Sequence, residues 1–310
     1  MAGVGAAAYV RTALHASSWY SDRASELESQ LAGWLKNARE KSPQPDEAAQ
    51  GRCAAVIAPH AGYSYSGPTA AWAYKYIDPS RIKRVFILGP SHHVYLENCA
   101  LSSATAYATP IGNMQLDADT AQELRNAAPS GTFGTMSRSV DEEEHSIEMH
   151  LPYVVHVMRG HDFKIVPILV GNLDDRAEQQ MGALLAPYLA DPENFFVISS
   201  DFCHWGKRFR YTPHDASAGP IHKSIENLDK RGMALIESLD VSGFAAYLRE
   251  TRNTICGRHP IGVLLNAIQA SPLELSLKFT HYAQSSPCTR MSDSSVSYAS
   301  AVVTAPAVSS

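Results

Sequence analysis

Three apolar segments of the chain each end in side chains that can bind a metal ion or transfer a proton. The segments, with the polar residues that follow them, are 54–58 with His60, 84–88 with His92 and His93, and 195–200 with Asp201, Cys203 and His204. Each is short and rich in apolar residues, which predicts a strand buried on both faces. In open α/β sheets the carboxyl ends of neighbouring strands meet at one edge, where ligands bind. We therefore expect one shared site at that edge.

The histidines indicate a metal only as a group. A single histidine at a strand end is more often explained by a structural hydrogen bond than by metal binding. Convergence of His60, His92 and His204 at one edge favours a metal, because imidazole suits zinc, copper and iron. His93 is expected to face outward or to support its neighbour, and Cys203 is expected to be a small buried residue.

Asp201 and His204 are a carboxylate and an imidazole three residues apart. A general base is often an imidazole oriented by a carboxylate, and an unperturbed pKa of about 6.5 suits proton transfer at neutral pH. The structural alternative is a turn capped by Asp201, with His204 packed on Trp205. The residues alone leave both interpretations open.

Cys256 lies in a polar loop containing glycine, shortly before a helix that is predicted to begin at Pro260. A thiol at this position is expected to have a lowered pKa, which favours metal binding or nucleophilic attack. An inert buried cysteine is the alternative. Arg258 in the same loop is expected to pair with an anionic substrate group or with a structural carboxylate.

The acidic run from Asp141 to Glu144 introduces a predicted helix. Its simplest interpretation is a solvated helix start, where carboxylates interact favourably with the helix dipole. His145 and Glu148 follow three residues apart on one helical face. They are candidates for a pocket wall, although solvation at the helix start explains them equally simply.

Composition excludes several classes of function. The net charge is −5 with no cluster of lysine or arginine, so nucleic-acid binding through a basic face is not expected. No apolar run approaches the roughly 20 residues of a membrane span, and the amino-terminal residues do not resemble a signal peptide. Five widely spaced cysteines, an odd number, indicate a reducing compartment. We expect a cytoplasmic enzyme or binding protein.

Alternating strands and helices with late antiparallel strands predict a single α/β domain, with a mixed central sheet flanked by helices. Residues 1–16 are expected to form a flexible lead-in, residues 17–304 the domain, and residues 305–310 a frayed tail. Expected helices cover 27–35, 69–76, 116–127, 142–158, 177–189, 221–239, 241–248 and 260–268. Expected strands cover 54–59, 84–88, 163–170, 195–200, 273–282 and 294–303, with a hairpin region at 100–113 and a polar loop at 41–52.

Several long strings of the sequence resemble the Memo family, in order and in spacing. They are APHAGYSYSG, RVFILGPSHHV, DEEEHSIEMHLPY, VISSDFCHWG and NTICGRHPIG. The resemblance extends from about residue 17 to about residue 304 and is closest to the eukaryotic members, which are named for mediating receptor-tyrosine-kinase-driven cell motility.

The resemblance implies a fold similar to class III extradiol dioxygenases, which are non-haem Fe(II) enzymes. It implies metal ligands at His60, His92 and Cys256, with Cys256 in the position of the dioxygenase glutamate. Asp201 and His204 would lie beside the metal, with His204 matching the general base. A thiolate is softer than a carboxylate, favours copper as well as iron, and is oxidisable, so the resemblance does not extend to ring cleavage.

The family is associated with iron or copper binding, redox activity and receptor signalling. The first implied function is therefore a metal-dependent, dioxygenase-like oxidoreductase in the cytoplasm, with the nucleus as a second location. The alternative is a signalling adaptor that binds a phosphotyrosine-containing receptor peptide in the same cleft without turnover. A scaffold with a vestigial site is the third reading. The residues expected to contact a ligand are Arg258, His145, Glu148 and His93.

Overall fold

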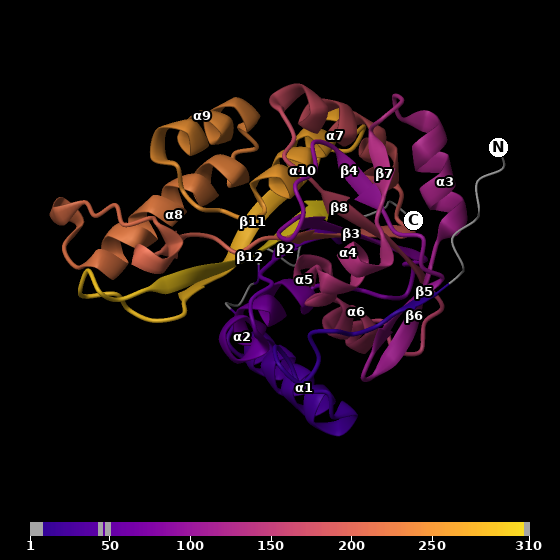
Figure 1. The fold of residues 1–310 in the computed structure, drawn as a ribbon, viewed down its shortest axis with the longest axis horizontal. Coiled ribbons are helices and arrows are strands. Elements are labelled where there is room, and N and C mark those ends of the chain that lie inside the picture. Colours follow the sequence, from indigo (N-terminus) through magenta and orange to yellow (C-terminus); the bar gives the residue numbers. More distant parts are fainter. Residues whose placement is uncertain (1–8, 43–45, 47–50, 307–310) are drawn as a thin grey trace.

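The computed structural model describes residues 9–42, 46 and 51–306, which form one mixed β-sheet with helices on both faces (Figure 1). The strands are β1 (Val10–Arg11), β2 (Arg52–Ala58), β3 (Arg84–Pro90), β4 (Cys99–Leu101), β5 (Ala106–Thr109), β6 (Gly112–Leu116), β7 (Phe133–Thr135), β8 (Lys164–Val170), β9 (Asn194–Ser199), β10 (His204–Trp205), β11 (Ser276–Gln284) and β12 (Ser295–Ala305). The predicted fold class, a single α/β domain with a mixed sheet, is confirmed.

The helices alternate with these strands along most of the chain. They are α1 (Ala24–Glu40), α2 (Tyr63–Tyr74), α3 (Ala118–Ala127), α4 (Arg138–Glu143), α5 (His145–Glu148), α6 (Leu151–Val157), α7 (Asp175–Ala190), α8 (Ile221–Glu237), α9 (Val241–Thr251) and α10 (Arg258–Ala270). Among the described residues, no helix combines the length and the apolar character that a membrane span requires.

The centre of the sheet is parallel, and its strands run in the order β6-β8-β3-β9-β2. Ile198 of β9 pairs with Leu88 of β3 on one side and with Ile57 of β2 on the other. The three strands therefore end at the same level, as the sequence predicts. β12 pairs antiparallel with β2, and β10 and β11 pair antiparallel with β12.

Each face of the sheet supports its own apolar core. Along β2, Ala55 and Ile57 belong to a core with α7, α9 and α10, whereas Val56 and Ala58 belong to a core with α1, α2 and α6. Side chains alternate between the faces of a strand, and both faces are covered, so the buried part of β2, residues 54–58, is apolar throughout.

The helix expected at 69–76 begins earlier than predicted. Gly67 and Pro68, which favour a turn, lie inside α2. A Cβ at Gly67 would meet the Trp34 ring of α1 at 2.5 Å, so glycine allows the close packing of α1 on α2. Tyr153 donates a hydrogen bond to the Gly67 carbonyl oxygen at 2.7 Å. Tertiary packing thus overrides the local turn signal.

The single helix expected at 142–158 is wrong, because the chain forms α4, α5 and α6 instead. Glu144 breaks the helix with an extended backbone, and its side chain caps α5 by accepting from the Ser146 backbone N–H. The solvated helix start is also wrong. Asp141 and Glu144 are each only 2% exposed, and Asp141 accepts hydrogen bonds from Tyr9 and other hydroxyl groups.

The ends of the expected domain also differ from the structure. Residues 10–11 form β1, which pairs with β5, so ordered structure begins before residue 17. Residue 116 ends β6 rather than beginning a helix, and β12 extends to residue 305. Most of the expected loop at 41–52 and of the expected tail lies outside the described residues, as do residues 1–8.

Candidate metal centre

His60, His92 and Cys256 converge beyond the carboxyl ends of the parallel strands. One ligand atom from each lies within 4.8 Å of the others. The Cys256 Sγ atom is 3.2 Å from His60 Nε2, and the two imidazole centroids are 5.2 Å apart. His60 follows β2, His92 follows β3, and Cys256 is contributed by the loop before α10. The structure therefore brings together the three residues that the sequence analysis assigned to a metal.

Hydrogen bonds define which nitrogen of His60 faces the cluster. Its Nδ1 atom lies 2.6 Å from the Ser199 hydroxyl oxygen, and that hydroxyl donates to the Ser146 carbonyl oxygen at 2.7 Å. Because the Ser199 proton is already used, His60 Nδ1 must carry the proton and donate. The Nε2 lone pair is then directed toward Cys256, as metal-binding histidines require. Burial keeps the imidazole neutral by lowering its pKa.

His92 is oriented in the same way by a carboxylate. Its Nδ1 atom lies 2.9 Å from Glu144 Oε1, and its backbone N–H donates to Glu144 Oε2 at 2.7 Å. The pKa of Glu144 is raised by burial, but the hydrogen bond from His92 and the nearby imidazoles outweigh this and lower it. Glu144 is therefore ionised and accepts from Nδ1, which leaves His92 Nε2 free to bind a metal.

The expectation of a lowered thiol pKa at Cys256 is wrong for the metal-free protein. Burial raises the pKa of the Cys256 thiol, and the nearby Asp201 carboxylate raises it further. Two N–H groups are directed at this part of the loop: the Asp201 backbone N–H donates to Cys256 Sγ, and the Gly257 N–H donates to the Ser200 hydroxyl. A bound cation would supply the positive charge that a thiolate requires.

Asp201 supports His60 rather than His204. Its Oδ1 atom accepts the His60 backbone N–H at 2.8 Å, and the side chain is 3% exposed. Burial raises the pKa of Asp201 to about 7, and the backbone hydrogen bond from His60 opposes this. The predicted orientation of His204 by Asp201 is therefore wrong.

Backbone carbonyl groups orient His204 instead. Its Nδ1 atom lies 2.9 Å from the Phe202 carbonyl oxygen and 3.1 Å from that of Thr254. Carbonyl oxygens only accept, so Nδ1 carries the proton and Nε2 has a free lone pair. Burial lowers the pKa of His204 below the ordinary value expected from sequence, which keeps this imidazole neutral. The geometry gives His204 the form that a proton acceptor needs.

Two cavities flank the cluster. The larger, of about 780 Å³, is lined by Trp19, Tyr65, Arg208 and Tyr298 together with His60, His145 and Asp201. The second, of about 700 Å³, is lined by His93, Tyr95, Cys256 and Arg258. His92, His204 and Phe209 line both. A ligand on either side would therefore lie beside the candidate metal ligands.

The candidate ligand-contacting residues differ in their positions. His145 stacks on His92 with ring centroids 4.4 Å apart, and it packs at a tilt against Trp19 at 4.6 Å, in the wall of the larger cavity. His93 and Arg258 line the smaller cavity. Glu148 is fully buried, so its assignment to a pocket wall is wrong.

Glu148 instead holds the amino-terminal segment against the site. It forms an ion pair with the buried Arg11 at 2.8 Å and accepts hydrogen bonds from His15 and Tyr20. The same segment contributes Trp19, which packs on His145. Sequence reasoning missed Arg11 because its partner lies more than 130 residues away in the chain.

Sequence reasoning also missed Ser199 and Glu144, which orient the two histidines. Ser199 is the last residue but one of the strand predicted at 195–200, and a hydroxyl at a strand end beside candidate ligands was an available signal. Glu144 directly precedes His145 within the acidic run, but nothing local distinguishes it from its exposed neighbour Glu143. Only the fold shows that Glu144 reaches His92.

Comparisons with known proteins match nearly the whole chain. A family model described as Memo-like protein matches residues 11–302. Identity is 53% over 294 residues with Protein MEMO1 of Danio rerio (93% of this chain, 95% of that protein) and 52% over 299 residues with Protein MEMO1 of Homo sapiens (95% and 97%). It is 45% over 300 residues with Protein memo-1 homolog of Caenorhabditis elegans (95% and 83%).

One solved structure, the uncharacterized protein JW3007 from Escherichia coli K12, aligns with a TM-score of 0.48 and 13% identity, covering 78% of this chain and 98% of that chain.

Proposed function

Because this chain belongs to the Memo-like family, we propose that it binds iron or copper through His60, His92 and Cys256 and acts as a metal-dependent redox protein. The convergence of two imidazole Nε2 lone pairs with one thiol carries this proposal. A nitrogen, nitrogen and sulfur donor set suits iron and copper, and the oriented tautomers supply the supporting hydrogen bonds that metal sites use.

The surrounding residues support proton transfer and ligand binding in this proposal. Bound iron or copper would supply redox chemistry and open coordination positions. His204 Nε2 would accept a proton from a group bound in the cleft, because Nδ1 is held protonated by two carbonyl oxygens. Trp19 and Tyr298 would pack against the body of a substrate, and Arg208 would attract a negatively charged group. We place this activity in the cytoplasm, with a link to receptor signalling and cell motility.

Metal analysis tests the proposal directly. Protein purified without chelator, or reconstituted anaerobically with Fe(II) or with copper, should hold about one metal ion per chain. Cys256→Ser should hold much less, because a hydroxyl is a poor substitute for a soft thiolate. Cys53→Ser is the matched control, since Cys53 lies in β2 away from the cluster. Equal metal content in the wild type and Cys256→Ser would contradict the proposed ligand set.

The alternative function is a signalling adaptor that binds a phosphotyrosine peptide without turnover. The larger cavity favours it, because aromatic walls and Arg208 provide a surface for a phosphorylated ring. Arg258 offers a second cation in the adjacent cavity. Phosphotyrosine peptide and its unphosphorylated form would be titrated against the wild type, Arg208→Ala and Arg258→Ala. Equal binding of both peptides by all three proteins would refute the adaptor function.

A further inference from the structure

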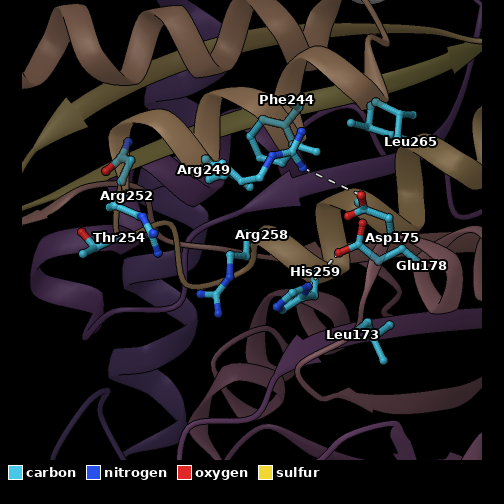
Figure 2. A pocket seen from close by; sticks show the side chains of 15 residues that line it. Leu173, Asp175, Glu178, Phe244, Arg249, Arg252, Thr254, Arg258, His259 and Leu265 are labelled. Carbon is cyan, nitrogen blue, oxygen red and sulfur yellow. Dashed lines mark hydrogen bonds and ion pairs between the residues drawn. The ribbon is translucent and has the colours of Figure 1, made fainter.

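A separate cavity of about 440 Å³ lies between α7, α9 and α10 (Figure 2). It shares Thr254, Arg258 and His259 with the smaller cavity beside the metal centre, but none of the three candidate metal ligands lines it. The size lies within the range of small-molecule sites. It is therefore a distinct recess on the α9–α10 side of the loop that carries Cys256.

One part of this cavity is apolar. Phe244 of α9 and Leu265 of α10 are each at most 3% exposed and, with the partly buried Val241 and Leu248, form one apolar wall, and Leu173, 6% exposed, lies opposite this wall. Figure 2 shows Phe244 and Leu265 on one side and Leu173 on the other, with polar side chains between them. An apolar ligand body would gain from burial against these side chains.

The two acidic side chains of the lining already have partners. Glu178 accepts a hydrogen bond from His259 at 2.7 Å, and Asp175 faces Arg249 at 3.8 Å (Figure 2). Glu178 also packs over Gly262, where a Cβ would meet its carboxylate oxygen at 2.1 Å. The absence of a side chain at Gly262 of α10 thus leaves the space in which the Glu178 carboxylate lies beside His259.

Two arginines of the lining are available for a ligand. Within the described part of the chain, neither Arg252 nor Arg258 forms an ion pair with a carboxylate within 4.0 Å. The Arg258 side chain donates a hydrogen bond to a neutral acceptor, Asn172 Oδ1, at 3.3 Å. Its charge also acts on the nearby Glu178 carboxyl, which His259 already hydrogen-bonds. Arg252 follows α9 with a left-handed backbone, φ 53°, and its N–H bonds to the Leu248 carbonyl oxygen, which fixes its backbone at the cavity rim.

We propose that this cavity binds a small organic carboxylate with an apolar body, whose charged group pairs with Arg252 and Arg258. Guanidinium groups match the planar carboxylate in bidentate geometry, and the apolar wall of α9 and α10 accepts an aromatic or branched alkyl group. The inference does not depend on the proposed metal chemistry, because no candidate metal ligand takes part. It assigns the chain a second ligand site, next to the first.

An NMR titration of the full-length protein with 4-phenylbutyrate tests this site. Saturable shifts should appear in signals of residues that line the cavity, with a dissociation constant on the order of 1 mM for a probe of this size. 4-Phenylbutan-1-ol has the same apolar body without the charge and should bind at least about tenfold more weakly. Binding of 4-phenylbutyrate should weaken with added salt, because Arg252 is exposed and Arg258 is half-buried.

Four variants locate the probe. Arg252→Gln should weaken binding about tenfold by removing one guanidinium group. Ala245→Phe should abolish binding by filling the apolar part while leaving both arginines in place. Arg290→Gln, at an exposed position outside the lining, should bind as the wild type does. Arg208→Gln removes a cation from the cavity beside the metal centre and should also have no effect.

The outcomes separate this cavity from the metal cleft. Loss of binding in Arg252→Gln and in folded Ala245→Phe, with normal binding in Arg208→Gln, supports the proposal. Loss in Arg208→Gln alone would place the probe in the metal cleft and overturn it. Equal affinity for acid and alcohol, or no saturable binding by the wild type, would also overturn it. Circular dichroism of each variant confirms that it is folded.

Discussion

Replacing Glu144 with glutamine should weaken metal binding by about 10- to 100-fold. Glu144 Oε1 accepts from His92 Nδ1 and from the Ser146 backbone N–H, each at 2.9 Å, while Oε2 accepts the His92 backbone N–H at 2.7 Å. Glutamine has only one acceptor oxygen. Its NH₂ group must therefore face one of these N–H donors, whichever way the amide is turned. Either the His92 backbone N–H or the His92 Nδ1–H group would then lose its acceptor, so the ring would no longer be held in its position or in its Nδ1-protonated form.

The magnitude follows from the hydrogen bonds. A factor of 10 to 100 corresponds to about 1.4–2.7 kcal/mol. That range agrees with the loss of one hydrogen bond to a charged group, about 1.5–3 kcal/mol. Because Glu144 is only 2% exposed, water is poorly placed to satisfy the unpaired donor. The effect should therefore not be diminished by solvent.

Competition titration with a chromophoric chelator, performed anaerobically for Fe(II), measures the change. Glu142→Gln is the matched control, because Glu142 belongs to the same acidic run but accepts from Thr12 rather than from His92. Thermal unfolding of both variants shows whether they are folded. If folded Glu144→Gln retains wild-type affinity, the carboxylate does not control the orientation of His92 and the reasoning is refuted.

Three further changes test other parts of the structure. His204→Ala should keep metal affinity within about tenfold of the wild type but lose any oxygen-consuming activity, whereas His92→Ala should lose the metal. Metal content and oxygen uptake are measured for both variants. Metal loss in His204→Ala equal to that in His92→Ala would show that His204 is itself a ligand. Arg11→Ala should destabilise the fold by about 3–5 kcal/mol in urea unfolding, because it leaves the Glu148 carboxylate buried without its cation. Adding Glu148→Gln to this variant should restore part of the lost stability. An unchanged urea midpoint in Arg11→Ala would contradict the role of the ion pair. Burial raises the pKa of Asp229 from 3.8 to about 6. As pH rises from about 4 to about 6, the unfolded chain therefore loses this proton before the folded protein does, and the wild type loses stability. The free energy of unfolding of Asp229→Asn relative to the wild type should therefore increase by up to roughly 3 kcal/mol between pH 4 and pH 7, measured by thermal melts. A stability difference that does not change with pH would contradict the raised pKa.

Sequence patterns identify the candidate site because its central residues follow local rules. His60 and His92 each follow an apolar strand, and parallel strands place such residues at one edge. Cys256 has no comparable pattern, since it comes from a loop, and its assignment depended on family resemblance. The fold class was predictable for the same reason, because alternation of strands and helices is visible along the chain.

The orienting groups could not be predicted in this way. Glu144 reaches His92 only because α4 and α5 are separate helices, and the expected continuous helix would not give this arrangement. The lowered pKa expected for Cys256 fails because burial and the nearby Asp201 raise the thiol pKa by more than the backbone hydrogen bonds from Asp201 and Gly257 lower it. Arg11 and Glu148 meet through the fold alone. In each case a long-range contact or desolvation overrides the local signal.

The position of β12 has a consequence for protein synthesis. β12 pairs with β2 and also with β10, which carries His204, yet it is translated roughly 240 residues after β2. At about 5–20 residues per second, β2 waits on the order of tens of seconds for this neighbour. During that time the nascent sheet has an open, apolar edge that invites pairing with other chains. His60 and His92 leave the ribosome well before Cys256, so the complete set of candidate ligands forms late, and under the proposed function metal loading with all three would belong to the final stage of folding.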